Sequence, residues 1–355
     1  MNLTVKNPRV VKLIRNAIST LKLDLTGLTV LTEAASGWYV LTPIIAALAG
    51  AKNVLAMTRE TRYGSVAEIQ KQTFEMAEFT KCAGRIRVLT DRDDISIADA
   101  DIVTNLGMIR PLDITFLRKL KPTAVIPLMW ETWEFRPEDL DLNGCLALGI
   151  PVLGTNEHHT DIDIFPYVGH LALKLAFEAG IEIWRSRFVI AGHGEFALLA
   201  KKSLESAGAS VVFADTQTSD ALLDTAFIAA LKDADALVVV DHHHRKIILN
   251  DTSPLSSGSL ALINPSISVL HISGGVDRQS LVNQGLACWP GRFAPAGYMS
   301  VATDYLGPRP LIDLHTAGLK VGEEMARNRL DGKSATQIME TLPSVFSLAQ
   351  GFKNL

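Results

Sequence analysis

The chain has 355 residues, of which 48% are apolar and 20% are charged, and its formal net charge is −4. This length suggests two domains, and this balance favours a buried core over disorder. An acidic balance without runs of Lys or Arg excludes the basic surface that attracts nucleic acid.

The three cysteines, Cys82, Cys145 and Cys288, stand far apart in the sequence. An odd number without close spacing fits neither a disulfide framework nor a zinc motif, and it favours a reducing compartment. The longest mainly apolar stretch, 39–51, is too short to span a bilayer and contains a proline. The N-terminus lacks the pattern of a signal peptide. The sequence therefore predicts a cytoplasmic protein without a membrane segment.

Short apolar runs alternate with helical periods in the first part of the chain. Helices are expected at 10–21 and 66–82, the second being the longest in this part. The expected strands are 28–31, 53–57, 86–89, 102–105, 124–128 and 151–153. Alternation of this kind predicts βαβ units and a parallel sheet that is covered on both faces.

A second series of the same kind follows a helical stretch at 164–178. Its expected strands are 188–191, 210–214, 237–240, 269–272 and a last short one at 312–314. A final amphipathic helix is expected from about Gly318 to Leu330. The predicted fold class is α/β, with two Rossmann-type doubly wound parallel-sheet domains.

Two helices are expected to connect the domains, the one at 164–178 and the one after His315. One domain would then comprise residues 1–155 together with 317–355, and the other would comprise residues 156–316. The cleft between the two domains would face the carboxyl ends of both sheets, where ligands bind in such folds.

A glycine-rich turn stands between the first strand and the first helix of the second series. Its residues, Gly-His-Gly-Glu-Phe-Ala at 192–197, fit the Gly-x-Gly-x-x-Ala fingerprint of a dinucleotide site. The first glycine permits the tight turn, the second lets the backbone approach a pyrophosphate, and the alanine lets the helix pack on the strand. The helix N-terminus then offers N–H donors and a positive dipole end to the phosphates. The expected cofactor contacts here are Gly192, His193, Gly194, Glu195 and Phe196.

The cofactor predicted for this turn is NAD. Asp215 ends the next strand, where a carboxylate accepts hydrogen bonds from the adenine ribose and repels a 2′-phosphate. No arginine follows it directly, which favours NAD over NADP. Further cofactor contacts are expected where the following strands end, at Asp241, His242, Ser273 and Gly274. Residues 156–316 would thus form the NAD-binding domain, and the other domain would bind the substrate.

The order of these parts resembles the D-2-hydroxyacid dehydrogenase family. Residues 139–152, with Gly-Ile-Pro-Val at their end, resemble the approach to that family's domain crossover, and 272–277 and 314–318 resemble two later motifs. The resemblance implies an NAD-dependent dehydrogenase, a homodimer, and His315 as a catalytic residue. Two residues of the family's catalytic set have no counterpart, an arginine near Gly274 and a glutamate between Cys288 and Gly307.

Hydride transfer at a carbonyl carbon needs a proton carrier and a group that fixes an anionic substrate. His315 suits the first role, and Asp313 would share its face in an extended segment and orient the ring. The alternative is a histidine at the start of a helix without a catalytic role. The candidates for substrate binding are Arg59, Arg62 and Arg278, since guanidinium groups clamp carboxylates and phosphates.

Three adjacent histidines, at 242–244, follow the third strand of the second series. Neighbouring side chains on a strand point to opposite faces, so these three are not expected to share one metal ion. We interpret this run as a polar loop and predict no metal site.

Together, these patterns predict an NAD-dependent oxidoreductase that acts on a small polar metabolite, such as a 2-hydroxy acid or a similar carbonyl or hydroxyl substrate. Two alternatives stay open at this point. One is a lyase or hydrolase that retains its NAD and oxidises its substrate transiently. The other is a nucleotide-binding protein without catalytic activity.

Overall fold

The computed structural model describes residues 5–218, 220–245 and 247–353. The chain divides into two compact units, the first formed by Met1–Asp163 with Pro308–Leu355 and the second by Ile164–Gly307. Both boundaries differ from the expected ones, which stood after residues 155 and 316. Residues 308–316, His315 among them, belong to the first unit.

The first unit contains a parallel sheet in the order β3-β2-β1-β4. A parallel bridge between Ile102 and Val125 continues this order to β5 and β6, and β14 adds an antiparallel edge. The sequence 3-2-1-4-5-6 is the Rossmann order, and it reverses direction between β1 and β4. The strands are β1 (Thr29–Glu33), β2 (Asn53–Met57), β3 (Ile86–Leu89), β4 (Ile102–Val103), β5 (Ile126–Pro127), β6 (Val152–Thr155) and β14 (Ala349–Gln350).

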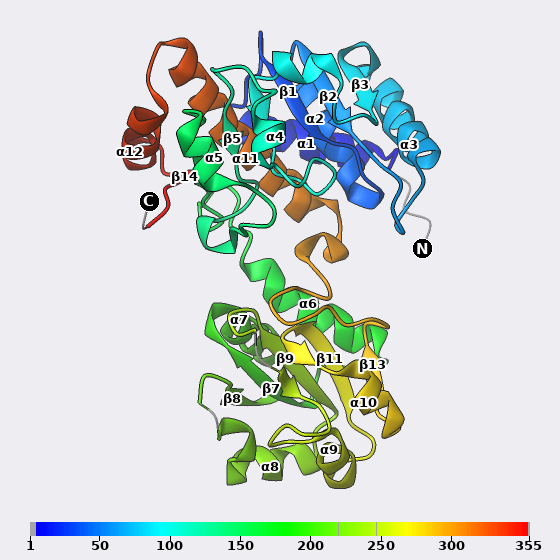
Figure 1. Cartoon of the computed structure of the whole chain (residues 1–355). Coiled ribbons are helices and arrows are strands. Elements are labelled where there is room, and N and C mark those ends of the chain that lie inside the picture. The colour runs from blue at the N-terminus through cyan, green and yellow to red at the C-terminus, as the bar shows by residue number, and fades with distance from the viewer. Residues whose placement is uncertain (1–4, 219, 246, 354–355) are drawn as a thin grey trace. The chain divides into compact units, whose positions relative to one another are not determined.

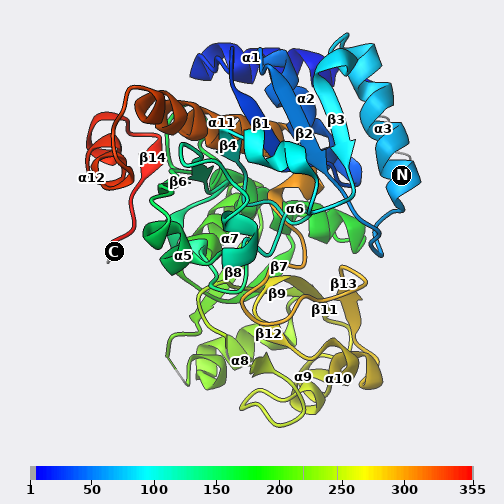
Figure 2. The same ribbon diagram turned by 45° about the horizontal axis from the view of Figure 1, so that its top comes forward.

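Helices pack against this sheet, as the upper part of Figure 1 shows for α2 and α3 beside β1, β2 and β3. Figure 2 shows α12 next to the edge strand β14. The α-helices are α1 (Pro8–Leu21), α2 (Leu41–Leu48), α3 (Val66–Phe79), α4 (Ile114–Leu117), α5 (Leu142–Ala147), α11 (Pro308–Leu330) and α12 (Ala335–Val345). The 3-10 helices are η1 (Gly37–Val40), η2 (Ala83–Arg85), η3 (Ile95–Asp99) and η4 (Thr132–Glu134).

Helix α11 overturns two expectations about the last part of the chain. Residues 312–314 are helical rather than a strand, and the helix begins at Pro308 rather than near Gly318. Prolines at 308 and 310 suit the first turn of a helix, whose N–H groups need no partner within it. Ile312, His315 and Leu319 are buried at helical spacing along one face. Within the described ranges, neither α11 nor another helix is long and apolar enough to cross a membrane.

The second unit contains a parallel sheet in the order β13-β11-β9-β7-β8, and a small parallel pair of β10 with β12. The strands are β7 (Arg187–His193), β8 (Ser210–Asp215), β9 (Ala236–Asp241), β10 (Ile247–Leu249), β11 (Ser268–Ser273), β12 (Gly275–Val276) and β13 (Ala287–Trp289). The helices are α6 (Pro166–Glu178), α7 (Gly194–Ser206), η5 (Ala221–Leu223), α8 (Thr225–Lys232), α9 (Ser257–Ile263), α10 (Arg278–Asn283) and η6 (Thr303–Leu306).

The central strands of the second sheet, β7, β9 and β11, are buried on both faces, which explains why they are almost continuously apolar. Along β7, Phe188 and Ile190 join the core beneath α6 and α7. Val189 and Ala191, which alternate with them, join the core beneath α8, α9 and α10. Helices on both faces make this unit doubly wound, as the sequence predicted, and the first unit has the Rossmann strand order.

Helices α6 and α7 approach each other closely at Gly169, and we predict that Gly169→Ala lowers the free energy of unfolding by about 1–3 kcal/mol. A Cβ there would lie 2.5 Å from the carbonyl oxygen of Leu199 and 2.2 Å from Oγ of Ser203. Urea unfolding measures the change. Gly291→Ala is the control, since a Cβ at Gly291 meets no atom of the described chain within 4 Å. Equal effects of the two changes would contradict the close helix packing.

Candidate functional site

The glycine-rich turn joins β7 to α7 through close backbone contacts. A Cβ at Gly192 would lie 2.4 Å from the carbonyl oxygen of Val240 on β9, and 2.9 Å from Cβ of Ala197. Gly194 has a φ of +71°, a conformation that favours glycine. The sequence therefore needs glycine at both positions, for packing at the first and for backbone conformation at the second.

This turn lies at the point where the strand order of the second sheet reverses. β7 pairs with β8 on one side and with β9 on the other. Gly192 is in register with Asp215 at the end of β8, and His193 with Asp241 at the end of β9. The structure thus brings together the glycine turn and two of the predicted acids at one carboxyl edge, where open α/β sheets bind their ligands.

Each of these two acids holds an imidazole ring. Nδ1 of His193 lies 2.7 Å from Oδ1 of Asp215, and Nδ1 of His244 lies 2.8 Å from Oδ2 of Asp241. Asp241 also accepts hydrogen bonds from the Thr216 hydroxyl and the His244 backbone N–H. Because an ionised carboxylate only accepts hydrogen bonds, both Nδ1 atoms carry hydrogen and the Nε2 atoms face elsewhere.

Both carboxyl groups are ionised at neutral pH. Burial raises the pKa of Asp241, but the Thr216 hydroxyl and the two His244 donors outweigh it, and the net pKa is below its usual value. At Asp215, burial is likewise outweighed by the Gln217 N–H and by His193, and the net pKa is lowered. The two carboxylates therefore act as fixed acceptors that orient the rings they hold.

A third ring, that of His243, covers Gly194. Its Nε2 and Cδ2 lie 2.9 Å from the place that a Cβ of Gly194 would occupy. The centroid of the His193 ring is 5.7 Å from that of His243 and 5.0 Å from that of His244. The three rings thus form one cluster beside the glycine turn, with His243 against Gly194 and His193 between His243 and His244.

The alternation expected for the histidine run does not apply, because β9 ends at Asp241 and the run lies beyond the strand. His243 and His244 both reach His193, while His242 packs against Phe196 with centroids 5.2 Å apart. Among the described residues, no group of three or more His, Cys, Asp or Glu side chains is arranged to hold a metal ion.

The remaining predicted cofactor contacts lie on α7 and at the end of β11. Glu195 is exposed in the first turn of α7, and Phe196 is buried beneath it. Ser273 pairs with Val240, and its buried hydroxyl has no hydrogen-bond partner within the described chain. Gly274 follows with a φ of +121°. The register places Ser273 at the carboxyl edge, with β9 between it and the glycine turn at the end of β7.

His271, which the sequence analysis did not single out, holds Gly274 in place. Its Nε2 donates to the carbonyl oxygen of Gly274 at 2.8 Å, so its Nδ1 accepts from the Ser300 hydroxyl at 2.6 Å. The ring is stacked on Phe293, and burial lowers its pKa to about 4. His271 is therefore a neutral structural residue at physiological pH.

The structure separates the two predicted catalytic residues. On α11, Asp313 and His315 are two positions apart, and side chains at that spacing on a helix do not face each other. Nδ1 of His315 instead lies 2.8 Å from the Thr42 hydroxyl, and its ring is 5.8 Å from that of Tyr39. The expectation that Asp313 orients His315 is wrong. Burial lowers the pKa of His315 to about 3 and raises that of Asp313 to about 6.

The predicted substrate-binding arginines have separate surroundings. Arg59 donates to the carbonyl oxygens of Gly107 and Arg110, so it ties two loops of the first unit together. Arg62 donates to the hydroxyl of its exposed neighbour Tyr63 and stacks on its ring. Arg278 is the first residue of α10 in the second unit, and its charge opposes the rise in the pKa of Cys288 that burial causes.

The carboxyl edge of the first sheet holds a residue that the sequence analysis missed. Glu33 ends β1, next to the point where the strand order reverses, and it is 4% exposed. Burial raises its pKa to about 7, although the Met108 N–H donates to it at 3.0 Å and Arg110 lies near. The available sequence signal was an acidic residue at the end of an apolar run, two positions beyond the expected strand 28–31.

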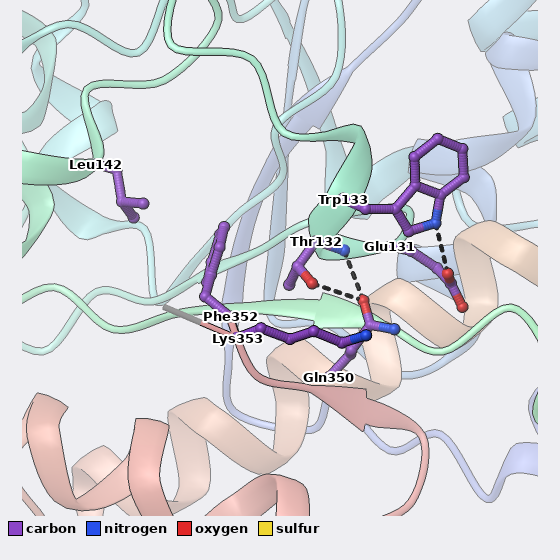
Figure 3. A pocket seen from close by; sticks show the side chains of 7 residues that line it. All are labelled: Glu131, Thr132, Trp133, Leu142, Gln350, Phe352 and Lys353. Carbon is purple, nitrogen blue, oxygen red and sulfur yellow. Dashed lines mark hydrogen bonds between the residues drawn. The ribbon is translucent and has the colours of Figure 1, made fainter. Parts of the chain in front are cut away.

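A cavity of about 360 Å³ lies elsewhere in the first unit, beside the last residues of the described chain (Figure 3). Gln350 reaches over it and accepts hydrogen bonds from the backbone and hydroxyl of Thr132, and the Trp133 indole donates to Glu131. None of the predicted site residues lines this cavity. It is lined by Glu131, Thr132, Trp133, Leu142, Gln350, Phe352 and Lys353.

No known family model matches this sequence, and no curated protein matches it by sequence. The solved structures similar to it include a dipicolinate synthase chain from Bacillus halodurans, which is 11% identical, with 86% of this chain and 98% of that chain covered and a TM-score of 0.49. The pyruvate reductase of Chlamydomonas reinhardtii is 13% identical, with 88% and 98% covered and a TM-score of 0.46. An NAD-dependent formate dehydrogenase from Staphylococcus aureus, in complex with NAD, is 15% identical, with 78% and 96% covered and a TM-score of 0.40.

The raised pKa of Glu33 predicts a stability that falls with rising pH. The folded state holds this proton to about pH 7 and the unfolded state only to its ordinary 4.5, so the free energy of unfolding decreases as pH rises between these values. Glu33→Gln should remove about 3 kcal/mol of this decrease, as measured by urea unfolding from pH 4.5 to 8. Glu78→Gln, at an exposed position of α3, serves as the control. Parallel profiles for the wild type and Glu33→Gln would refute the prediction.

Proposed function

We propose that this protein is an NAD-dependent oxidoreductase that acts on a small polar metabolite. The observation that carries the proposal is the glycine turn at 192–197, which lies at the switch point of the second sheet with Asp215 in register beside it. Turn, helix and acid have the arrangement that a dinucleotide fold requires. The unit Ile164–Gly307 would then bind NAD, and the other unit would bind the substrate.

The start of α7 supports binding of the pyrophosphate. The His193 side chain does not cap this helix, because its Nδ1 is bonded to Asp215. The first N–H groups of a helix carry a partial positive charge and suit a phosphate. Asp215, which is ionised and partly exposed, would accept the adenine-ribose hydroxyls and disfavour a 2′-phosphate.

NAD would supply the hydride chemistry, and the chain would supply binding and proton transfer. His315 is our proposed proton carrier, and a 2-hydroxy acid is the proposed substrate class, in line with the resemblance to D-2-hydroxyacid dehydrogenases. Burial keeps the His315 ring neutral at physiological pH, and a neutral ring can accept the proton of a hydroxyl group. Arg59, Arg62 and Arg278 are the proposed groups for an anionic substrate. A homodimer and a cytoplasmic location stay predictions.

Calorimetry with NAD on protein stripped of cofactor tests the nucleotide site directly. We expect one site per chain. Gly194→Val should abolish binding, because a branched side chain fits neither the φ of +71° nor the space that the His243 ring takes. Binding that survives this change would place the nucleotide elsewhere.

Asp215→Ala should weaken NAD binding by about 1–3 kcal/mol, the cost of an unmade hydrogen bond to a charged group. It should also narrow the preference for NAD over NADP, because the charge that repels a 2′-phosphate is lost. The measurement is the ratio of the two dissociation constants. Asp220→Ala, at an exposed position beyond β8, is the matched control. An unchanged ratio would rule out the ribose role of Asp215.

His315→Ala should abolish turnover and leave the dissociation constant of NAD nearly unchanged, since His315 and the glycine turn belong to different units. A general acid–base group contributes about 10²–10⁴-fold to a rate. The measurement is the absorbance of reduced nicotinamide during a screen of 2-hydroxy and 2-oxo acids. Thr42→Val removes the hydrogen-bond partner of the ring and tests whether that contact orients it. Full activity of His315→Ala would exclude His315 as the proton carrier.

A further inference from the structure

The side chains that could give the proposed nucleotide site a positive charge are histidines. The His243 ring lies against Gly194, and the His193 ring, on the neighbouring residue, lies beside the rings of both His243 and His244. Imidazole is the side chain that gains its charge between pH 8 and 5, whereas Lys and Arg are charged throughout this range. A site that relies on such rings changes its own charge with pH.

Two of these rings are oriented to present Nε2. His193 and His244 each direct Nδ1 to a carboxylate, at 2.7 Å and 2.8 Å. A protonated ring held in this way has its second N–H group for an acceptor outside the pair. The carboxylate stabilises the positive charge, and the side chains of His193 and His244 keep 22% and 28% of their surface exposed.

The third ring, that of His243, lies where the pyrophosphate is expected to bind. The second glycine of the fingerprint lets the pyrophosphate approach the backbone, and here the Nε2 edge of His243 lies 2.9 Å from the missing Cβ of that glycine. An incoming phosphate therefore meets His243 at the backbone of Gly194. The ring either donates to the phosphate oxygens or has to give way.

We propose that the pyrophosphate of the bound nucleotide is held by the protonated rings of His193, His243 and His244, so that nucleotide binding takes up protons from solvent. This inference rests on the proposed nucleotide site. Each ring takes one proton at the nitrogen that then donates to a phosphate oxygen, and no bond of the nucleotide changes. The anionic diphosphate supplies the free energy that draws protons onto the rings.

The other charged groups described at this edge are acids, and they favour a site whose rings are protonated. Asp215 faces His193 from β8, and Asp241 faces His244 from the end of β9, where it is fully buried. Glu195 is exposed in the first turn of α7. With acids on each side, neutral rings would leave the dianionic pyrophosphate in a negative environment, and protonated rings remove this conflict.

The test is calorimetry of NAD and of ADP-ribose binding to the whole chain at pH 6, 7 and 8.5, at constant ionic strength. At each pH, two buffers with different ionisation enthalpies are used, because the difference in heat counts the protons taken up. We expect uptake at pH 7 to 8.5 and a dissociation constant that rises by up to about tenfold per pH unit for each proton. ADP-ribose should behave like NAD, since it keeps the pyrophosphate and lacks the nicotinamide.

Single substitutions test which of the three rings take up the protons. His193→Gln, His243→Gln and His244→Gln should each flatten the pH dependence and lower the proton count, with affinities at pH 6 reduced toward the wild-type value at pH 8.5. His170→Gln, at an exposed position of α6 in the same unit, is the control and should change neither quantity.

The outcomes separate this inference from the proposed function. Binding with a pH-independent dissociation constant and equal heats in both buffers would overturn the proton linkage and leave the nucleotide site intact. Tighter binding by His243→Gln at every pH would mean that His243 obstructs the phosphate, and would remove it from the set. Absence of binding at every pH, with both probes, would overturn the nucleotide site itself.

Discussion

The closeness of β7 and β9 at Gly192 is the constraint on which the second unit depends. A side chain there would meet the Val240 carbonyl at 2.4 Å, so only glycine lets the two strands remain paired up to their ends. This pairing sets the switch point, the direction in which α7 leaves the sheet, and the place of Asp241 beside His193. The histidines that follow β9 reach the glycine turn only because the strands end in register. A backbone requirement at one residue thus determines which side chains can meet at the edge.

In each sheet, a strand beside the reversal point ends at a carboxyl group, and the pKa values of these two groups shift in opposite directions. Glu33 ends β1 and Asp241 ends β9, and both are buried. Burial raises the pKa of Glu33 to about 7, because the backbone N–H groups that reach it do not offset the loss of water. Asp241 has the Thr216 hydroxyl and two donors of His244, and its pKa is lowered. The balance between burial and the hydrogen-bond donors decides which carboxyl stays charged. One edge can therefore hold a proton near neutrality while the other holds a fixed negative charge.

Local patterns in the sequence predicted the parts that depend on local chemistry. Strand β7 and the Gly-x-Gly-x-x-Ala turn that follows it could be predicted from periodicity and from the conformations open to glycine, and both appear where expected. The segment 312–314 was mistaken for a strand because its apolar residues alternate around Asp313. The segment instead belongs to the longer helical pattern of α11, and the prolines at 308 and 310 made this pattern hard to recognise in the sequence. The imidazole–carboxylate pairs could not be predicted, since His193 and Asp215 meet only through the register of β7 with β8.

An acidic chain that binds an acidic cofactor has to supply positive charge locally. The net charge of −4 gives no long-range attraction for a dianionic pyrophosphate, and the acids Asp215 and Asp241 stand at the very edge where it would bind. A lysine or arginine there would carry its charge at all times and would pair with these acids in the empty site. An imidazole differs from these side chains, because it can take up its proton from solvent when a phosphate arrives. The same acids that appear unfavourable for phosphate binding are then what stabilises the cation that binds it.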